Sequence, residues 1–302
     1  MTGGIGAVAG GVSGSTATVA LSLASAAIWG TSDFVGGIAA RRLPSPAVVT
    51  LAHSLSLALL ISLALIHGST RPDTQSAVYG ALAGVACGTG VMVLYKALAL
   101  GGMGLTAAVS GVLAAVMPVI WAFATEGLPR APQLAGIVLA GVAIWMIASA
   151  PGSPSSKQAI LLGAAAGGSF GCLYIFLKLA GRGGVLWPLA CSRMASTTLA
   201  AAVTWIGMRR AGRAKIDSRA KLPWPGWLVL GLIAIAGVFD ASGNTFYTIA
   251  TRLGRLDIAA VLSSLYPAST ILLAAVLLKE RTTLSQAAGM ALALVAVVLI
   301  SV

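Results

Sequence analysis

The sequence predicts an all-α polytopic membrane protein whose ten transmembrane helices form two inverted five-helix repeats. Three observations lead to this fold class. First, the composition is too apolar for a soluble protein, since 58% of the 302 residues are hydrophobic, 9% are charged and the mean hydropathy is +0.96. Second, the apolar residues fall in runs of about 20, the length that a helix needs to cross a bilayer. Third, the pattern of residues 246–302 already occurs at residues 94–149.

The apolar runs define the expected elements in chain order. Ten spans are expected at about 18–40, 45–67, 76–100, 104–125, 131–150, 158–181, 185–208, 224–250, 256–278 and 283–301. The connections between them carry most of the basic residues, as in other membrane proteins. Membrane β-strands are excluded, because each run is about twice the length of such a strand and does not alternate. Residues 1–17 have no basic segment before an apolar core, so a cleaved signal peptide is not expected.

The repeated pattern indicates an internal duplication with inverted topology. The matching pairs are Tyr95 with Tyr247, 107–109 with 259–261, Glu126 with Glu280, Gln133 with Gln286, and Gly136 with Gly289. The copies begin five spans apart. Because five is odd, the two halves enter the membrane from opposite sides, as in many secondary transporters. Residues 150–157 read APGSPSSK and form a linker, so the expected units are 18–150 and 158–302.

These features together resemble the EamA-type members of the drug/metabolite transporter superfamily. The resemblance rests on Trp29-Gly30, on Tyr-Lys-Ala-Leu at 95–98, on Tyr266-Pro267 followed by 279–281, and on Gly289. It implies ten helices and a secondary transporter that exports a small amphipathic metabolite, amino acids among them, across the bacterial inner membrane by alternating access. One departure is that the position matching Pro267 is Leu113, with a proline at 118 instead. The sequence therefore leaves open whether the fourth helix bends where the ninth does.

The orientation in the membrane is predicted differently by two arguments. Lys and Arg are in excess after odd-numbered spans, mostly within 209–221, and the positive-inside rule then places both termini outside. The resemblance implies termini in the cytoplasm, and we take this as the expectation. The basic segment could also contact anionic lipid head groups.

Ionisable residues inside the spans are the strongest candidates for a functional site, because each costs several kcal/mol in lipid unless it is paired or hydrated. These are Asp33, His53, Arg193 and Asp240. One interpretation is a buried ion pair of Arg193 with Asp33 or Asp240 that fixes helix register. The other is that Arg193 and His53 contact substrate while Asp240 or Asp33 titrates and couples transport to protons.

Aromatic and hydroxyl residues complete the candidate site. Asn244 and Tyr247 follow Asp240 on one helix face, and the aromatic residues suit a substrate with an apolar body and a polar handle, although core packing is the alternative for each. The predicted substrate-binding residues are Trp29, Asp33, His53, Tyr95, Arg193, Asp240, Asn244, Tyr247, Ser263 and Tyr266. Glycines at four-residue intervals, at 80, 84 and 88 and at 163, 167 and 171, predict close helix packing.

Other function classes are not supported by the residue pattern. The net charge of +12 comes from connections between spans, so no nucleic acid partner is expected. Three dispersed cysteines and two distant histidines predict no metal site, and no phosphate-binding loop or other cofactor motif is present. A monomer, with membrane lipid, substrate and protons as its partners, is the expectation. A proton-coupled drug exporter, an intramembrane enzyme using Asp33 and Asp240, and a channel remain the alternatives.

Overall fold

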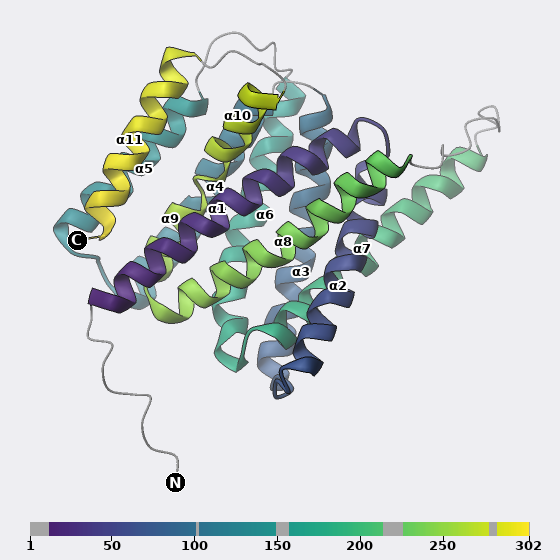
Figure 1. Cartoon of the computed structure of the whole chain (residues 1–302), viewed down its shortest axis with the longest axis horizontal. Coiled ribbons are helices and arrows are strands. Elements are labelled where there is room, and N and C mark those ends of the chain that lie inside the picture. The colour runs from purple at the N-terminus through teal and green to yellow at the C-terminus, as the bar shows by residue number, and fades with distance from the viewer. Residues whose placement is uncertain (1–11, 101–102, 149–156, 214–225, 278–282, 302) are drawn as a thin grey trace.

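The chain folds into a helical bundle, seen in a computed structural model that describes residues 12–100, 103–148, 157–213, 226–277 and 283–301 (Figure 1). The described residues form helices and no strand. The helices are α1 Val12–Ala40, α2 Ser45–Ile66, α3 Thr74–Ala99, α4 Met103–Glu126, α5 Ala131–Ala148, α6 Lys157–Ala180, a 3-10 turn η1 Gly181–Gly183, α7 Leu186–Arg213, α8 Trp227–Leu253, α9 Leu256–Ser263, α10 Tyr266–Leu277 and α11 Leu284–Ser301.

The helix positions follow the expected spans closely. Within the described residues, seven segments are long and apolar enough to cross a membrane. The expected span 256–278 is interrupted, because α9 ends at Ser263 and α10 begins at Tyr266. Pro267 lies at this break, and a proline both lacks an N–H and disfavours helix geometry in the residue before it. By contrast, α4 continues through Pro118 without interruption.

The bundle is built from pairs of helices that pack along one another. In Figure 1, α1 and α8 run side by side across the front, and α5 and α11 form a pair at the edge. Behind them, α3 packs against both α6 and α7, and α2 packs against α7 and α8. The interior between α1, α3, α6 and α8 contains the largest side chains of the core, among them Trp29 and Tyr174.

The glycine faces allow the closest helix contacts, as the sequence predicts. A Cβ atom on Gly84 of α3 would meet the carbonyl group of Ser192 on α7, and one on Gly167 of α6 would meet the carbonyl oxygen of Ser110 on α4. Backbones can approach this closely only where no side chain intervenes. The packing interpretation of the glycines is therefore confirmed at these positions.

Two helix starts depend on specific residues in the preceding turns. The Asp73 carboxylate accepts a hydrogen bond from the Ser76 backbone N–H at 2.8 Å and so caps α3. Hydrogen bonds from Ser76 also lower the pKa of Asp73 below its ordinary value. Before α7, Gly184 has a φ of +120°, a conformation that a residue with a Cβ rarely adopts.

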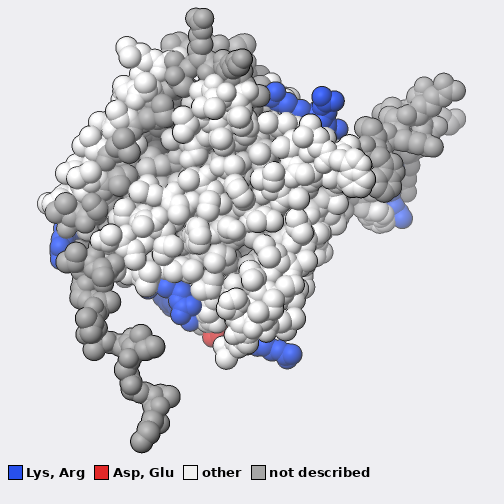
Figure 2. Space-filling model, in the orientation of Figure 1, with Lys and Arg blue, Asp and Glu red and all other residues white. Residues whose placement is uncertain are grey.

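The outer surface is suited to lipid. Large apolar side chains are exposed around the bundle, for example Ile66 at 78% and Leu161 at 70%. On the face shown in Figure 2, the Lys and Arg side chains lie at the margins and a broad uncharged band separates them. Trp121 is also 41% exposed and faces outward, so it does not line an internal pocket. Trp205 is also exposed, and the guanidinium carbon of Arg209 lies over its ring, 3.8 Å from the centroid.

Candidate functional site

A buried ion cluster joins α2, α3, α7 and α8. Arg193 of α7 is fully buried, and its Nη1 lies 2.8 Å from Oδ2 of Asp240 on α8. The same nitrogen lies 3.3 Å from Nε2 of His53 on α2 and 3.3 Å from Sγ of Cys87 on α3. Of the two carboxylates that the sequence offered as partners for Arg193, the structure therefore pairs Asp240 with it.

The hydrogen bonds around His53 define its tautomer. The Ser196 hydroxyl donates to the backbone carbonyl of Arg193 at 3.1 Å, so its oxygen can accept from Nδ1 of His53 at 2.9 Å. Nδ1 then carries the proton and Nε2 can accept from Arg193, which has only donors. This tautomer satisfies the contacts of the ring with Ser196 and Arg193, and Nε2 also lies 3.5 Å from Oδ2 of Asp240. The role of Ser196 was not anticipated, although its position three residues after Arg193 places both on one helix face.

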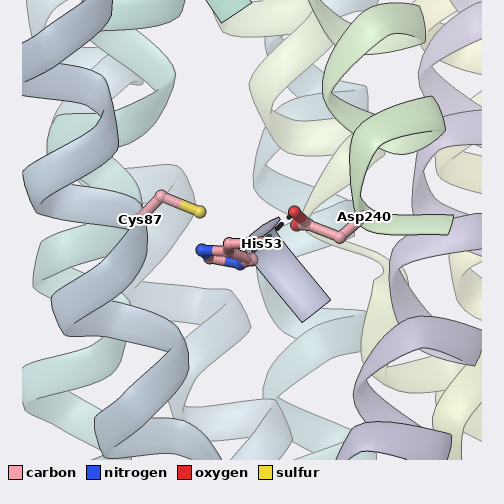
Figure 3. Close-up of side chains that lie close together, drawn as sticks. All are labelled: His53, Cys87 and Asp240. Carbon is pink, nitrogen blue, oxygen red and sulfur yellow. Dashed lines mark ion pairs between the residues drawn. The ribbon is translucent and has the colours of Figure 1, made fainter. Parts of the chain in front are cut away.

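Three side chains of the cluster have the chemistry of metal ligands. His53, Cys87 and Asp240 point toward one another, and their nitrogen, sulfur and oxygen atoms lie within 4.8 Å (Figure 3). Nη1 of Arg193, however, lies within 3.3 Å of the sulfur and nitrogen and closer to the oxygen. A permanently charged guanidinium therefore occupies the position that a metal ion would need.

Asp240 is also held by its own helix. The Asn244 side-chain amide donates to Oδ1 of Asp240 at 3.1 Å and to its backbone carbonyl at 2.6 Å. Tyr247, one turn further on, is buried and stacks on Tyr174 with ring centroids 4.7 Å apart. The polar stripe expected on α8 thus faces the interior, with its first two residues in the ion cluster and its third among aromatic rings.

A small cavity lies beside the ion cluster. It is lined by Trp29, Asp33, Cys87, Val91, Phe170, Leu173, Tyr174, Asp240 and Tyr266. Only about 20 Å³ is open to the centre of a water-sized sphere, which is room for about one water molecule. Binding sites for metabolites have volumes of about 300 Å³ or more. In this structure the cavity is therefore too small to hold a metabolite.

The walls of the cavity are aromatic. Trp29 stacks on Tyr174 with centroids 5.5 Å apart, and Phe170 meets Tyr266 edge to face at 6.4 Å. Each such pair contributes about 0.5–1.5 kcal/mol beyond its buried area. The Tyr266 hydroxyl donates to the Ser110 hydroxyl at 2.9 Å, which ties α10 to α4.

The second carboxylate of the cavity, Asp33 of α1, differs from Asp240 in its surroundings. It is 8% exposed, and it forms no hydrogen bond or ion pair with any residue in the described part of the chain. The structure thus separates a paired carboxylate from an unpaired one, a distinction that the sequence did not reveal.

The ten predicted residues fall into three groups. Trp29, Asp33, Asp240 and Tyr266 line the cavity, whereas His53, Arg193 and Asn244 surround Asp240 from behind. The other three are buried but do not line it: Tyr95 donates to the Ser32 carbonyl at 3.4 Å, Ser263 donates to the Ser22 carbonyl at 3.3 Å, and Tyr247 stacks on Tyr174. The lining residues that were not predicted include Cys87 and Phe170, and nothing in their local sequence distinguishes them from ordinary core residues.

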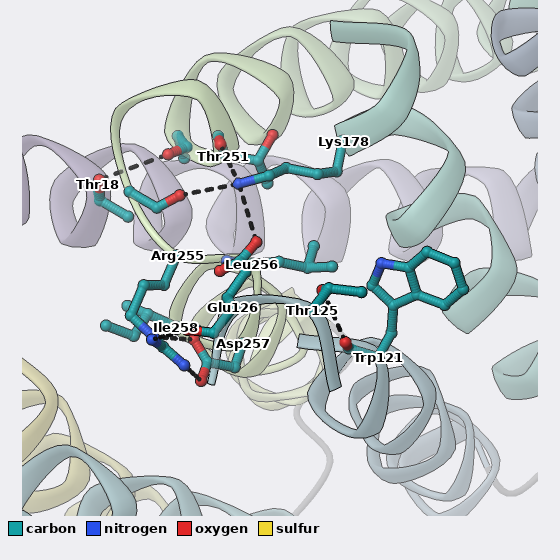
Figure 4. A network of polar contacts seen from close by, with 12 residues as sticks. Thr18, Trp121, Thr125, Glu126, Lys178, Thr251, Arg255, Leu256, Asp257 and Ile258 are labelled. Carbon is teal, nitrogen blue, oxygen red and sulfur yellow. Dashed lines mark hydrogen bonds and ion pairs between the residues drawn. The ribbon is translucent and has the colours of Figure 1, made fainter. Parts of the chain in front are cut away.

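A second polar network joins helix ends at one end of the bundle (Figure 4). Glu126, the last residue of α4, forms an ion pair with Lys178 of α6 at 3.2 Å and accepts from the Leu256 N–H of α9 at 3.1 Å. Lys178 also donates to the backbone carbonyls of Thr251 at 2.7 Å and Gly254 at 3.2 Å. We call Glu126, Lys178 and these three backbone groups the end network. Glu280, the residue of the second repeat that matches Glu126, lies outside the described residues.

Arg255 extends the end network toward α4. It binds Asp257 through Nε at 3.1 Å and Nη2 at 2.9 Å, and it donates to the backbone carbonyl of Glu126 at 3.2 Å. The hydrogen bonds and the charge of Asp257 raise the pKa of Arg255 above its ordinary value. The connection between α8 and α9 is thereby fixed to the end of α4.

Comparisons with known proteins agree with this architecture. Residues 157–302 match the EamA-like transporter family. No curated protein matches the sequence. Among 18 matching solved chains, one crystal structure of a protein has a TM-score of 0.70 with 16% sequence identity, and the match covers 94% of this chain and 96% of the other. At this identity the likeness shows a shared fold. The sequence of the second half, residues 157–302, is thus similar to the EamA-like transporters, and the long apolar helices are those of a multi-pass membrane protein.

Proposed function

We propose that the protein is a secondary transporter that moves a small amphipathic metabolite by alternating access. The observation that carries this proposal is the cavity among the membrane-spanning helices, which combines aromatic side chains with two carboxylates. Ionisable groups in such a position are expensive and usually serve a transport pathway. In alternating access, a central site of this kind is reached from each side of the membrane in turn.

The proposal includes ten spans arranged as two inverted halves, 18–150 and 158–302. The helix pairing supports this symmetry. In two such halves, α1 of the first corresponds to α6 of the second, and α3 corresponds to α8. The packing of α1 against α8 then corresponds to the packing of α3 against α6, and both pairs are closely packed. By the same relation α5 corresponds to α11, so these two helices pack against each other as a symmetric pair. The fourth helix of the first half, α4, corresponds to α9 and α10 together. A two-fold relation of this kind gives a transporter two related conformations.

The finer assignments rest on the resemblance of the sequence. We propose amino acids, aromatic or hydrophobic ones in particular, as the first substrate class to test, and export across a bacterial inner membrane with cytoplasmic termini and a monomeric protein. Protons, an exchanged solute or the substrate gradient supplies the energy. Of these, coupling to protons is supported by the presence of a carboxylate, Asp33, that has no partner among the described residues.

Uptake into proteoliposomes tests the function. The full-length protein would be reconstituted and given radiolabelled amino acids, with an imposed pH gradient or without it. Saturable uptake above that of empty liposomes is expected. The variant Asp33→Asn tests coupling, because removing a titratable group from the cavity should remove the dependence on the gradient, and Asp73→Asn provides the same chemical change on the surface.

The outcomes separate the parts of the proposal. Uptake that depends on the gradient and loses this dependence in Asp33→Asn supports proton coupling. Saturable uptake that ignores both the gradient and the variant makes the protein an exchanger or facilitator. If the folded protein moves none of the amino acids, the proposed substrate class is wrong.

A further inference from the structure

The charges that line the cavity do not balance. Two carboxylates, Asp33 and Asp240, line it, and no basic side chain does. Asp240 is compensated from behind by Arg193 at 2.8 Å. Asp33 is 92% buried and has no hydrogen bond or ion pair within the described residues. A buried carboxylate without a partner is costly, so its site favours any ligand that brings a positive charge.

The aromatic walls favour the same charge. Trp29, Tyr174, Phe170 and Tyr266 surround the space into which Asp33 faces. The face of an aromatic ring carries negative electrostatic potential and attracts a cation, by about 0.5–2 kcal/mol for each desolvated contact. An anionic group would meet two carboxylates and these electron-rich rings, and no basic side chain lines the cavity to offset them.

We propose that the cavity, once opened, binds an organic cation: an aromatic or aliphatic body among the rings, with an ammonium group on the Asp33 carboxylate. This inference rests on the proposed function, in that it takes the cavity as the substrate site. It narrows the substrate class, because the polar handle of the amphipathic substrate is positively charged. A free amino acid satisfies the site less well than the corresponding amine, since its carboxylate is repelled by Asp33 and Asp240.

A series of ligands with one body and different charges tests this directly. Tryptamine, tryptophol and indole-3-propionate share an indole ring and carry an ammonium, a hydroxyl and a carboxylate. Their binding to the full-length protein in lipid nanodiscs would be measured by equilibrium competition against radiolabelled tryptamine. We expect tryptamine to bind about tenfold more tightly than tryptophol, which is the net gain that one hydrogen bond to a charged group provides, and indole-3-propionate to bind more weakly than both.

The variant Asp33→Asn tests whether the Asp33 carboxylate causes the preference for tryptamine over tryptophol. The variant should lose about tenfold in tryptamine affinity and keep its affinity for tryptophol, whereas Asp73→Asn, outside the cavity, should keep both. Equal binding of tryptamine and tryptophol by the unmodified protein, or no binding of tryptamine, overturns the proposal without reference to any variant. A preference that persists in Asp33→Asn overturns it as well.

The same ligands distinguish this proposal from the proposed function. Binding of tryptamine that depends on Asp33, without uptake into proteoliposomes, supports the cation site and contradicts the transport function. Uptake of neutral or anionic indoles in preference to tryptamine supports transport and contradicts the cation site.

Discussion

At the residue scale, Arg193 and Asp240 determine the centre of the bundle. Arg193 uses Nη1 for all its described side-chain contacts, and Asp240 is its only carboxylate partner among the described residues. Removing one partner of a buried pair leaves the other charged and unsolvated, whereas removing both charges together can be nearly neutral. The pair and the unpaired Asp33 should therefore respond to mutation in opposite ways.

We expect Asp240→Asn to lower the stability of the protein by about 3 kcal/mol, because Arg193 then has no counter-charge. The double variant Arg193→Met with Asp240→Asn should recover part of this loss. Asp33→Asn should leave the melting temperature unchanged or raise it, since its charge has no partner to lose. Thermal unfolding in one mild detergent measures all three, and a large loss in Asp33→Asn would show that Asp33 has a stabilising partner.

At the element scale, the contact between α3 and α7 depends on the absence of a side chain. Gly84 meets the Ser192 backbone directly, while a Cβ on Gly168 of α6 would have nothing within 4 Å. We expect Gly84→Ala to destabilise the protein by about 1–3 kcal/mol through overpacking against backbone, which cannot move as a side chain can. The matched change Gly168→Ala should be neutral or slightly stabilising, because alanine favours helix. Equal melting temperatures for the two variants would contradict the packing of α3 on α7.

The start of α3 should respond to pH. The hydrogen bonds from Ser76 lower the pKa of Asp73 in the folded protein, so the cap is fully formed above the unfolded pKa of about 3.9 and is lost as pH falls through the lower, folded value. Amide hydrogen exchange in the first turn of α3 should therefore accelerate, relative to the intrinsic rate, as acid protonates Asp73. Asp73→Asn keeps an oxygen acceptor and should remove this pH dependence, whereas Asp73→Ala should speed exchange at every pH.

The sequence predicts the elements better than it predicts their contacts. The helices follow from the apolar runs, and the shared face of Asp240 and Asn244 follows from helix periodicity, so both could be predicted. The choice of Asp240 over Asp33 as the partner of Arg193 depends on how each helix is rotated, which local sequence does not determine. Cys87 and Phe170 line the cavity for the same reason, although alone they look like core residues. A bend of the ninth span at Pro267 was implied by the resemblance, whereas a full interruption between Ser263 and Tyr266 was not predicted.

At the scale of the whole molecule, the end network connects four helices at one end of the bundle. Lys178 of α6 is shared by the Glu126 carboxylate of α4 and by two carbonyls at the end of α8, while Glu126 also holds the first N–H of α9. The two charged side chains are 22% and 23% exposed, so water reaches the network. Any opening of the bundle at this end must separate these groups.

Lys178→Met should therefore loosen this end without affecting the centre. Because one ammonium serves three acceptors, we expect amide exchange at the end of α8 and the start of α9 to rise by about tenfold, which corresponds to about 1.4 kcal/mol. Arg182→Gln, an exposed basic residue that follows α6, should leave exchange unchanged. Swapping the charges, with Glu126→Lys and Lys178→Glu, should not restore slow exchange. A carboxylate at 178 would face the carbonyls of Thr251 and Gly254, and a lysine at 126 could not accept from Leu256. Full rescue by the swap would instead mean that the ion pair alone holds this end together.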